Sequence, residues 1–233
     1  MRRKSDLLAV ALPIESAPPH RKGMQVTQLW RYPVKSMAGE PLDRAAITNA
    51  GIPGDRVVLV RHGARIVTSR SRPRLLLHHA TLGEDGEPRV DGLPWQSPEV
   101  ARRVRDATAL DAELVRDDTL ERFDVLPLLV ITDGALAAFG RDPRRLRPNL
   151  VIGGVAGLAE RTWPGRVLAI GSVRIRLVTR RRRCIMTTFD PETAAQDPQV
   201  LLDIHQRFSG ELALDAEVLV PGSIAVGDRA CLE

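Results

Sequence analysis

Short apolar runs separated by turn residues extend from Met24 to the end of the 233-residue chain, and they constrain the fold more than any other feature of the sequence. The clearest run, Val173 to Val178, alternates apolar residues with Arg174 and Arg176. Side chains that alternate in this way point to opposite faces of a strand. The runs therefore predict a mainly β fold with a few helices, of the α+β class.

Helix signals are fewer. Thr132 and Asp133 can cap a helix over residues 134–139, which Gly140 would end, and Pro198 opens a second helical pattern with apolar residues at helical spacing as far as Phe208. Residues 99–109 fit no element clearly. Residues 75–79, which follow Pro73, read as a further strand.

Cys184 follows four consecutive arginines, residues 180–183. A nearby guanidinium stabilises a thiolate relative to a thiol, which makes Cys184 a candidate nucleophile or soft-metal ligand. A cysteine beside a strand can also be a small buried hydrophobe, which is our reading of Cys231. A charge run is usually a solvated face, so we expect Arg180 to Arg182 to set electrostatic potential rather than to coordinate a ligand.

The formal net charge of +5 favours anionic partners such as a phosphate-bearing cofactor, nucleic acid or an acidic protein. Only four Phe, three Trp and one Tyr are present, which argues against stacking platforms for single-stranded nucleic acid. Two cysteines do not make a disulfide framework, so a reducing cytoplasm is the expected location. Residues 1–23 read as a flexible basic tail, and no apolar run approaches the ~20 residues that span a bilayer.

Six separated segments together resemble one family, the MOSC proteins with an N-terminal MOSC-associated β-barrel domain, to which the mitochondrial amidoxime reducing component belongs. Each segment is weak alone, but they occur in the family's order. They are Tyr32-Pro-Val-Lys-Ser36, Gly54-Asp-Arg56, Thr68-Ser-Arg70 with Pro73-Arg-Leu75, Arg147-Pro-Asn-Leu-Val-Ile152, residues 183–193 beginning Arg183-Cys184, and Pro221-Gly-Ser-Ile-Ala-Val-Gly-Asp228.

The resemblance implies a MOSC β-barrel packed with a smaller N-terminal β-rich domain. We accordingly expect a tail at 1–23, the N-terminal domain at 24–117 and the MOSC domain at 118–233. The family's usual Phe-Gly pair is not evident between Leu212 and Glu217, and the segment from Phe123 to Leu126 also departs from the family pattern. Both differences concern the substrate pocket and part of the cofactor site.

The resemblance also implies a molybdenum cofactor, a pyranopterin dithiolene with a terminal phosphate, whose metal is ligated by Cys184. It assigns the cofactor contacts to basic residues and one hydroxyl: Lys35, Ser36, Arg56, Arg70, Arg147 and Arg183. Guanidiniums match phosphate oxygens in bidentate fashion, whereas lysine acts as a point charge. The chain lacks a four-cysteine ferredoxin pattern and so should carry no iron–sulfur cluster, and Lys35 as the one lysine outside the tail argues against pyridoxal phosphate.

The implied activity is reduction of N-hydroxylated or N-oxide small molecules, with electrons from a separate reductase, ferredoxin or cytochrome. Two alternatives stay open. MOSC domains also resemble part of the cofactor sulfurases, so Cys184 could carry sulfur as a persulfide. Basic charge alone would support a nucleic-acid-binding protein, although no recognition helix is evident.

Overall fold

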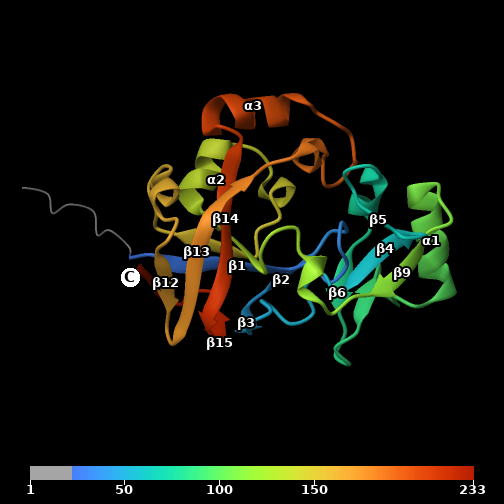
Figure 1. Ribbon diagram of the computed structural model, residues 1–233, viewed down its shortest axis with the longest axis horizontal. Helices are drawn as coiled ribbons and strands as arrows, with labels where there is room; N and C mark the ends of the chain where they lie inside the picture. The colour runs from blue at the N-terminus through green and yellow to red at the C-terminus, as the bar shows by residue number, and fades with distance from the viewer. Residues whose placement is uncertain (1–22) are drawn as a thin grey trace, which may run out of the picture.

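Two ten-residue strands, β13 (Val173–Arg182) and β14 (Glu211–Val220), pair along their length at the centre of the larger part of the molecule (Figure 1). The computed structural model describes residues 23–233, so the expected tail lies outside the described residues except for Gly23. In β13 Val173, Ile175 and Leu177 are buried, while Arg174 and Arg176 are more exposed. The alternation predicted from the sequence is therefore confirmed, and the strand continues to Arg182, two residues before Cys184.

β13 and β14 belong to an eight-stranded sheet with the order β16-β12-β13-β14-β10-β11-β1-β2. Neighbouring strands are antiparallel except for β10 and β11, which are parallel. Within the described residues this sheet stays open, because β16 and β2 lie at its two ends. The other six strands are β1 (Gln25–Arg31), β2 (Glu40–Leu42), β10 (Leu128–Thr132), β11 (Leu150–Gly153), β12 (Val167–Ile170) and β16 (Ala230–Leu232).

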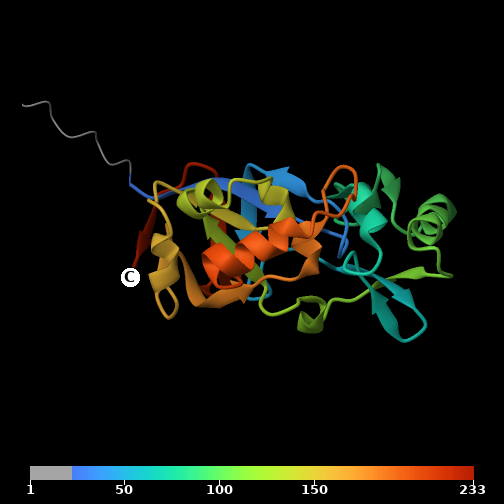
Figure 2. The same ribbon diagram turned by 90° about the horizontal axis from the view of Figure 1, so that it is seen from above.

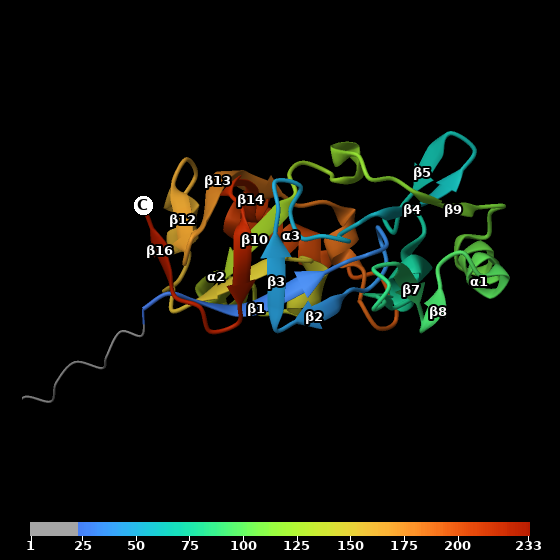
Figure 3. The ribbon, with the colours of Figure 1, turned by 90° about the horizontal axis from the view of Figure 1, so that it is seen from below.

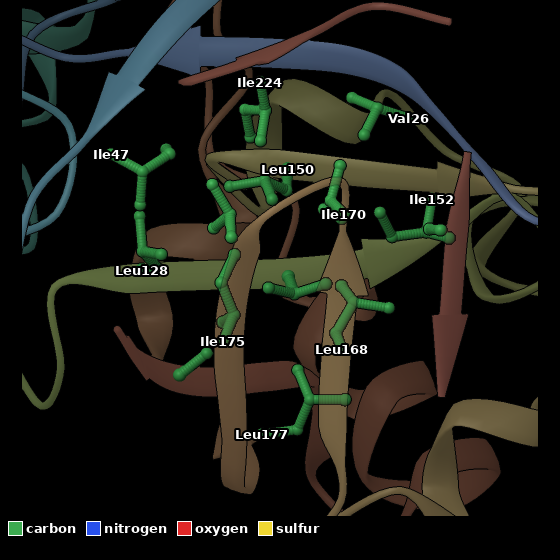
Figure 4. Packing of buried hydrophobic residues seen from close by; sticks show 14 of the residues in the cluster. Val26, Ile47, Leu128, Leu150, Ile152, Leu168, Ile170, Ile175, Leu177 and Ile224 are labelled. Carbon is green, nitrogen blue, oxygen red and sulfur yellow. The ribbon is translucent and has the colours of Figure 1, made fainter. Parts of the chain in front are cut away.

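The larger core is formed by the apolar face of this sheet together with β3 (Arg44–Ile47) and β15 (Gly222–Ala225), which pair with each other. Figure 4 shows Leu168 and Ile170 of β12 beside Ile175 and Leu177 of β13, and Leu150 of β11 belongs to the same cluster. Full burial of a side chain of this size contributes about 1.5–3 kcal/mol. The core therefore fixes Val173 to Leu177, the first half of the strand that leads to Cys184.

A smaller part of the molecule lies beside the eight-stranded sheet (Figure 3). It has its own apolar core, which includes Val58, Val60, Val100 and Val104. Residues 99–109, which the sequence did not assign to any element, lie mostly in the helix α1 (Pro98–Thr108). Ser97 caps this helix by accepting a hydrogen bond from the Val100 amide. The elements of this smaller part are β4 (Val58–His62), β5 (Arg65–Val67), β6 (Ala80–Leu82), β7 (Pro88–Val90), β8 (Leu93–Pro94), β9 (Glu113–Arg116) and α1 (Pro98–Thr108).

The prediction of a strand at residues 75–79 is wrong. Residues Pro73–Leu77 form a 3₁₀ turn, η1, that starts at the proline, and the His78 amide donates back to the Leu75 carbonyl. Leu75 and Leu76 are both buried although they are adjacent in sequence. A strand would have placed them on opposite faces, whereas a turn can bury both.

Two helices cover the other face of the sheet, as seen from above in Figure 2. Thr132 caps α2 (Asp133–Phe139), and Gly140 ends it with a positive φ, both as predicted. α3 (Gln199–Phe208) follows Pro198 and buries Val200, Ile204 and Phe208, while Leu202 is exposed. The remaining 3₁₀ turns are η2 (Leu120–Arg122), η3 (Pro143–Arg145), η4 (Ala159–Thr162) and η5 (Ile185–Thr188).

The mainly β fold with a few helices is thus confirmed, but the sequence order is interleaved in space. β1 pairs with β11 and β3 pairs with β15, so these two early strands belong to the larger core, whereas Val34 and Met37 between them pack in the smaller core. The division into domains at 24–117 and 118–233 stays a prediction. No helix in residues 23–233 is both long and apolar enough to cross a membrane.

The pairing of β13 with β14 is interrupted opposite the arginine run. Arg180 pairs with Leu214 and Arg182 with Glu211, so Arg181 faces two residues, Leu212 and Ala213. Ala213 has a φ of 75°, a conformation that glycine adopts at far lower cost. Leu212-Ala213 is therefore where the family's Phe-Gly pair would fit, which the sequence alone did not reveal.

We predict that Ala213→Gly stabilises the protein. A residue other than glycine in the left-handed region costs roughly 1–2 kcal/mol, and glycine removes this cost from the folded state. Glycine also makes the unfolded chain more flexible, which offsets about half of the stabilisation. The free energy of unfolding should therefore rise by about 0.5 kcal/mol. Urea denaturation measures the change. Ala169→Gly in the regular strand β12 is the control and should destabilise by roughly 1 kcal/mol; a loss in both variants would contradict the assignment of strain to Ala213.

Candidate functional site

A cavity of about 740 Å³, which includes the open space at its mouth, contains every site residue predicted from the sequence. These residues come from the loop after β1, the turn before β4, the loop after β5, the turn before β11 and the end of β13. The cavity wall includes Lys35, Ser36, Arg56, Arg70, Arg147, Arg183 and Cys184. The structure therefore brings together all seven, although they are spread over 150 positions of sequence.

Two guanidiniums lie over one aromatic ring at the floor of the cavity. The Cζ atom of Arg147 is 4.2 Å from the ring centroid of Tyr32, and that of Arg56 is 5.0 Å away. The Tyr32 hydroxyl donates to the Pro148 carbonyl at 3.0 Å. Burial raises the pKa of Tyr32 to about 12, so the ring stays neutral and offers its electron-rich face to both cations.

The fully buried carboxylate of Asp55 joins three of the sequence motifs. It accepts a hydrogen bond from the Tyr32 amide at 2.7 Å and another from the Asn149 side chain at 3.2 Å, and it forms an ion pair with Arg56. Asn149 in turn accepts from the Leu129 amide and donates to the Trp30 carbonyl. In the sequence, Asp55 was only the middle residue of the Gly54-Asp-Arg56 motif and had no assigned role, yet it fixes the positions of the predicted cofactor contacts.

Three of the predicted residues have left-handed backbone conformations. Ser36, Arg56 and Arg147 have φ values of 73°, 57° and 54°. For residues other than glycine such conformations are uncommon and persist only where the surroundings enforce them. The strain therefore marks the floor of the cavity as a place where side-chain direction is closely determined.

Buried N–H groups at the floor lack hydrogen-bond acceptors. Among the described residues, Arg147 Nη2 and Arg183 Nε are buried without a partner. Burial lowers the pKa of each side chain to about 10, which still leaves both guanidiniums protonated at neutral pH. Burying an unpaired charge or donor is costly, so the cavity is built to receive an anionic or strongly accepting group.

Cys184 is partly exposed and lies at the wall of the cavity beside Arg70. Arg70 interacts electrostatically with the thiol and forms an ion pair with Asp124, a residue that the sequence did not single out. The Asp124 carboxylate lies 2.6 Å from Arg70 and 2.9 Å from Lys35. Burial lowers the pKa of Arg70, but Asp124 and Cys184 outweigh it and raise the pKa overall. Asp124 lies in the segment that departs from the family pattern.

The turn that follows Cys184 is held by Arg145, which also lines the cavity. Arg145 donates to the carbonyls of Thr187 and Thr188 at 3.3 and 3.1 Å and forms an ion pair with Asp190 at 2.9 Å. The Thr187 amide also donates to the Cys184 carbonyl. These bonds hold η5 in place, so the direction of the cysteine is set by residues on both sides of it.

The arginines 180–183 do not all lie on the same side, because the pairing of β13 with β14 is irregular between Arg180 and Arg182. Four consecutive residues, 181–184, line the cavity, which a regular alternating strand could not do. Arg180 is turned away and pairs with Glu211 at 3.1 Å. The expectation that Arg180 to Arg182 only set the electrostatic potential therefore fits the placement of Arg180 alone.

The prediction that Cys231 is buried is wrong, because its side chain is exposed.

The chain is similar to two known protein domains and to characterised relatives. Residues 23–122 match the MOSC N-terminal beta barrel domain, and residues 134–230 match the MOSC domain. The chain is 30% identical to "Mitochondrial amidoxime reducing component 2" of Macaca fascicularis over 76% of this chain and 70% of that protein. It is 27% identical to "Mitochondrial amidoxime-reducing component 1" of Mus musculus over 89% of this chain and 82% of that protein.

Among solved structures, the crystal structure of the YUAD protein from Bacillus subtilis aligns with a TM-score of 0.49 and 12% identity over 89% of this chain and 94% of that one. This score is too low to carry an argument about the fold. The two family matches and the identity to the amidoxime reducing components are sufficient without it. The chain therefore belongs to the family of MOSC-domain proteins that carry an N-terminal MOSC β-barrel domain.

Proposed function

We propose that this protein is a molybdenum-cofactor-dependent oxidoreductase that reduces N-hydroxylated or N-oxide compounds. The observation that carries the proposal is a single cavity in which Cys184 lies beside guanidiniums whose buried N–H groups have no acceptor. The names of the relatives add support, because amidoximes are N-hydroxylated compounds.

The residues present fit the cofactor in charge and in donor type. A dithiolene cofactor with a terminal phosphate would supply acceptors for Arg147 and Arg183, and the Ser36 hydroxyl and Arg56 lie on the same cavity wall. Cys184 would hold the metal, because a thiolate is a soft ligand. When bound, the cofactor supplies the two-electron chemistry that removes oxygen from nitrogen.

The chain's own groups bind, orient and exclude water. The stack of Arg147 and Arg56 on Tyr32 presents fixed positive charge at the floor, and Arg145 holds the turn after Cys184. Asp124 keeps Lys35 and Arg70 together at the rim. A preorganised cationic wall of this kind binds an anion without reorganising at the moment of reaction.

Electrons would come from a separate protein. Arg182 lines the cavity and is exposed, which suits an acidic electron carrier, because complementary charge speeds encounter. Arg181 and Arg183 face the cavity instead of a flat surface. That arrangement argues against the nucleic-acid-binding alternative.

A second candidate, a sulfur carrier, is favoured by one observation: the Cys184 thiol is accessible and adjacent to Arg70. A cation stabilises a thiolate or persulfide. A persulfide on Cys184 that can be trapped by alkylation, in protein that shows no reductase turnover, would support the carrier.

We predict that Cys184→Ala purified from a host that makes the cofactor contains roughly 10–100-fold less molybdenum per chain than the wild type, because the metal loses its protein ligand. Elemental analysis of the purified protein measures this. Cys231→Ala removes the other, exposed thiol and should retain the wild-type content. The proposal would be contradicted by wild-type protein that contains no molybdenum, or by equal molybdenum contents in Cys184→Ala and Cys231→Ala.

We predict that Arg147→Met stabilises the cofactor-free protein by about 1 kcal/mol, because replacing buried charge by an apolar side chain is often neutral or favourable. The same change should abolish the rise in melting temperature that inorganic pyrophosphate gives the wild type. Denaturant and thermal unfolding measure both effects. The exposed Arg229→Met serves as the control and should alter neither; a pyrophosphate response that survives in Arg147→Met would contradict the assigned anion site.

A further inference from the structure

A buried ion pair at the rim of the cavity has no role in the function proposed above. Arg181 Nη2 lies 2.8 Å from Asp215 Oδ1, and the two side chains are 17% and 2% exposed. Within residues 23–233, Arg181 Nε is buried without a hydrogen-bond partner, and no N–H points at Asp215 Oδ1 although the charges are in contact. The pair is therefore close but incompletely satisfied.

The irregular strand pairing gives this pair its direction. Asp215 lies between β10 and β13, opposite Leu129 and Thr179, where its side chain is enclosed. Arg181 lies opposite the two β14 residues of the bulge, Leu212 and Ala213. Its guanidinium lines the cavity, whereas Arg180 pairs with Glu211 outside it. Bulges commonly redirect a side chain in this manner.

The charges around the cavity are connected, with Asp124 and Arg183 interacting both with the Tyr32 stack and with the groups around Arg181. Tyr32, Arg56 and Arg147 interact with one another at the floor. Arg181 interacts with Asp124 and Asp215 at the rim and with the neighbouring Arg183. The free N–H groups of Arg147 and Arg181 belong to different side chains, so a phosphate that binds Arg147 at the floor would leave the Nε–H of Arg181 available to another ligand.

Asp215 makes the position of Arg181 tenable. Arg181 and Arg183 lie two residues apart and repel each other, whereas Asp215 attracts both. A buried carboxylate behind two arginines offsets this repulsion and restrains the guanidinium that it touches. Burial raises the pKa of Asp215, while the two arginines oppose that change.

We propose that Arg181, positioned by Asp215, is a specificity-determining residue that binds a carboxylate on the substrate. The preferred substrates are then N-hydroxylated compounds that carry a carboxylate at a distance from the N–O group. A guanidinium with a free N–H fits a carboxylate oxygen, and a charge-assisted bond of this kind is among the stronger ones. The proposal rests on the proposed function, whose reaction takes place beside Cys184.

The test compares benzamidoxime with its 4-carboxylate, two compounds that differ by one charge. KM and kcat are measured for both, and calorimetry measures their dissociation constants independently of turnover. The variants are Arg181→Gln, Asp215→Asn and the double variant, which removes both charges and so avoids an unpaired buried carboxylate. Arg180→Gln is the matched control, because Arg180 is the neighbouring arginine, is also paired with a carboxylate, and lies outside this cavity.

We expect the wild type to favour the carboxylated compound. The ratio of its KM to that of benzamidoxime should rise about tenfold in Arg181→Gln and in the double variant, the equivalent of one charge-assisted hydrogen bond. Asp215→Asn should raise the ratio less, with little change in kcat. Arg180→Gln should keep the wild-type ratio, and the ratio of dissociation constants should follow the same order.

Three results would overturn the proposal. The first is a wild type without preference for the carboxylated compound. The second is an unchanged ratio in Arg181→Gln accompanied only by lower stability, which would leave the pair a purely structural one. The third is a loss of molybdenum in Arg181→Gln, which would assign this arginine to the cofactor. Wild-type protein without molybdenum would instead contradict the proposed function, and calorimetry would still decide the carboxylate subsite.

Discussion

The side chain of Asp55 accepts hydrogen bonds from the Tyr32 amide and from Asn149 and forms an ion pair with Arg56, all without access to solvent. A buried carboxylate is tolerated only when its oxygens are satisfied, so these partners cannot shift independently. Tyr32 then fixes Arg147 by stacking, and Asn149 fixes the ends of neighbouring strands. The geometry of the cavity floor follows from this one group.

The cavity concentrates features that oppose folding. Its floor contains left-handed residues and unsatisfied guanidinium N–H groups, and its rim contains a buried carboxylate whose contact with Arg181 is poorly aligned. Proteins commonly accept such local costs where a ligand is to be bound. The well-packed apolar cores on either side supply the stability that makes these costs tolerable.

The sequence was informative where residues act through local pattern or through a recognisable motif. Alternation in residues 173–178 predicted β13, and the motifs predicted seven residues that do line one cavity. Their roles as cofactor contacts stay predictions. The strand expected at 75–79 failed because two adjacent leucines are buried by a turn, which an apolar run cannot distinguish from a strand. Asp124, Arg181 and Asp215 escaped because their importance comes from partners far along the chain and from an irregularity in strand pairing.

The interleaved strand order has a consequence for biosynthesis. β1 pairs with β11, and the Thr27 hydroxyl donates a hydrogen bond to the Val151 carbonyl, 124 positions away in the sequence. The amide of Ala230, in the last strand, donates a hydrogen bond to the carbonyl of Met24. Contacts of such long sequence separation form late, because loop closure must precede them. The larger sheet therefore cannot be completed until β16 has left the ribosome, and the cavity cannot form before Arg183 and Cys184 have been synthesised.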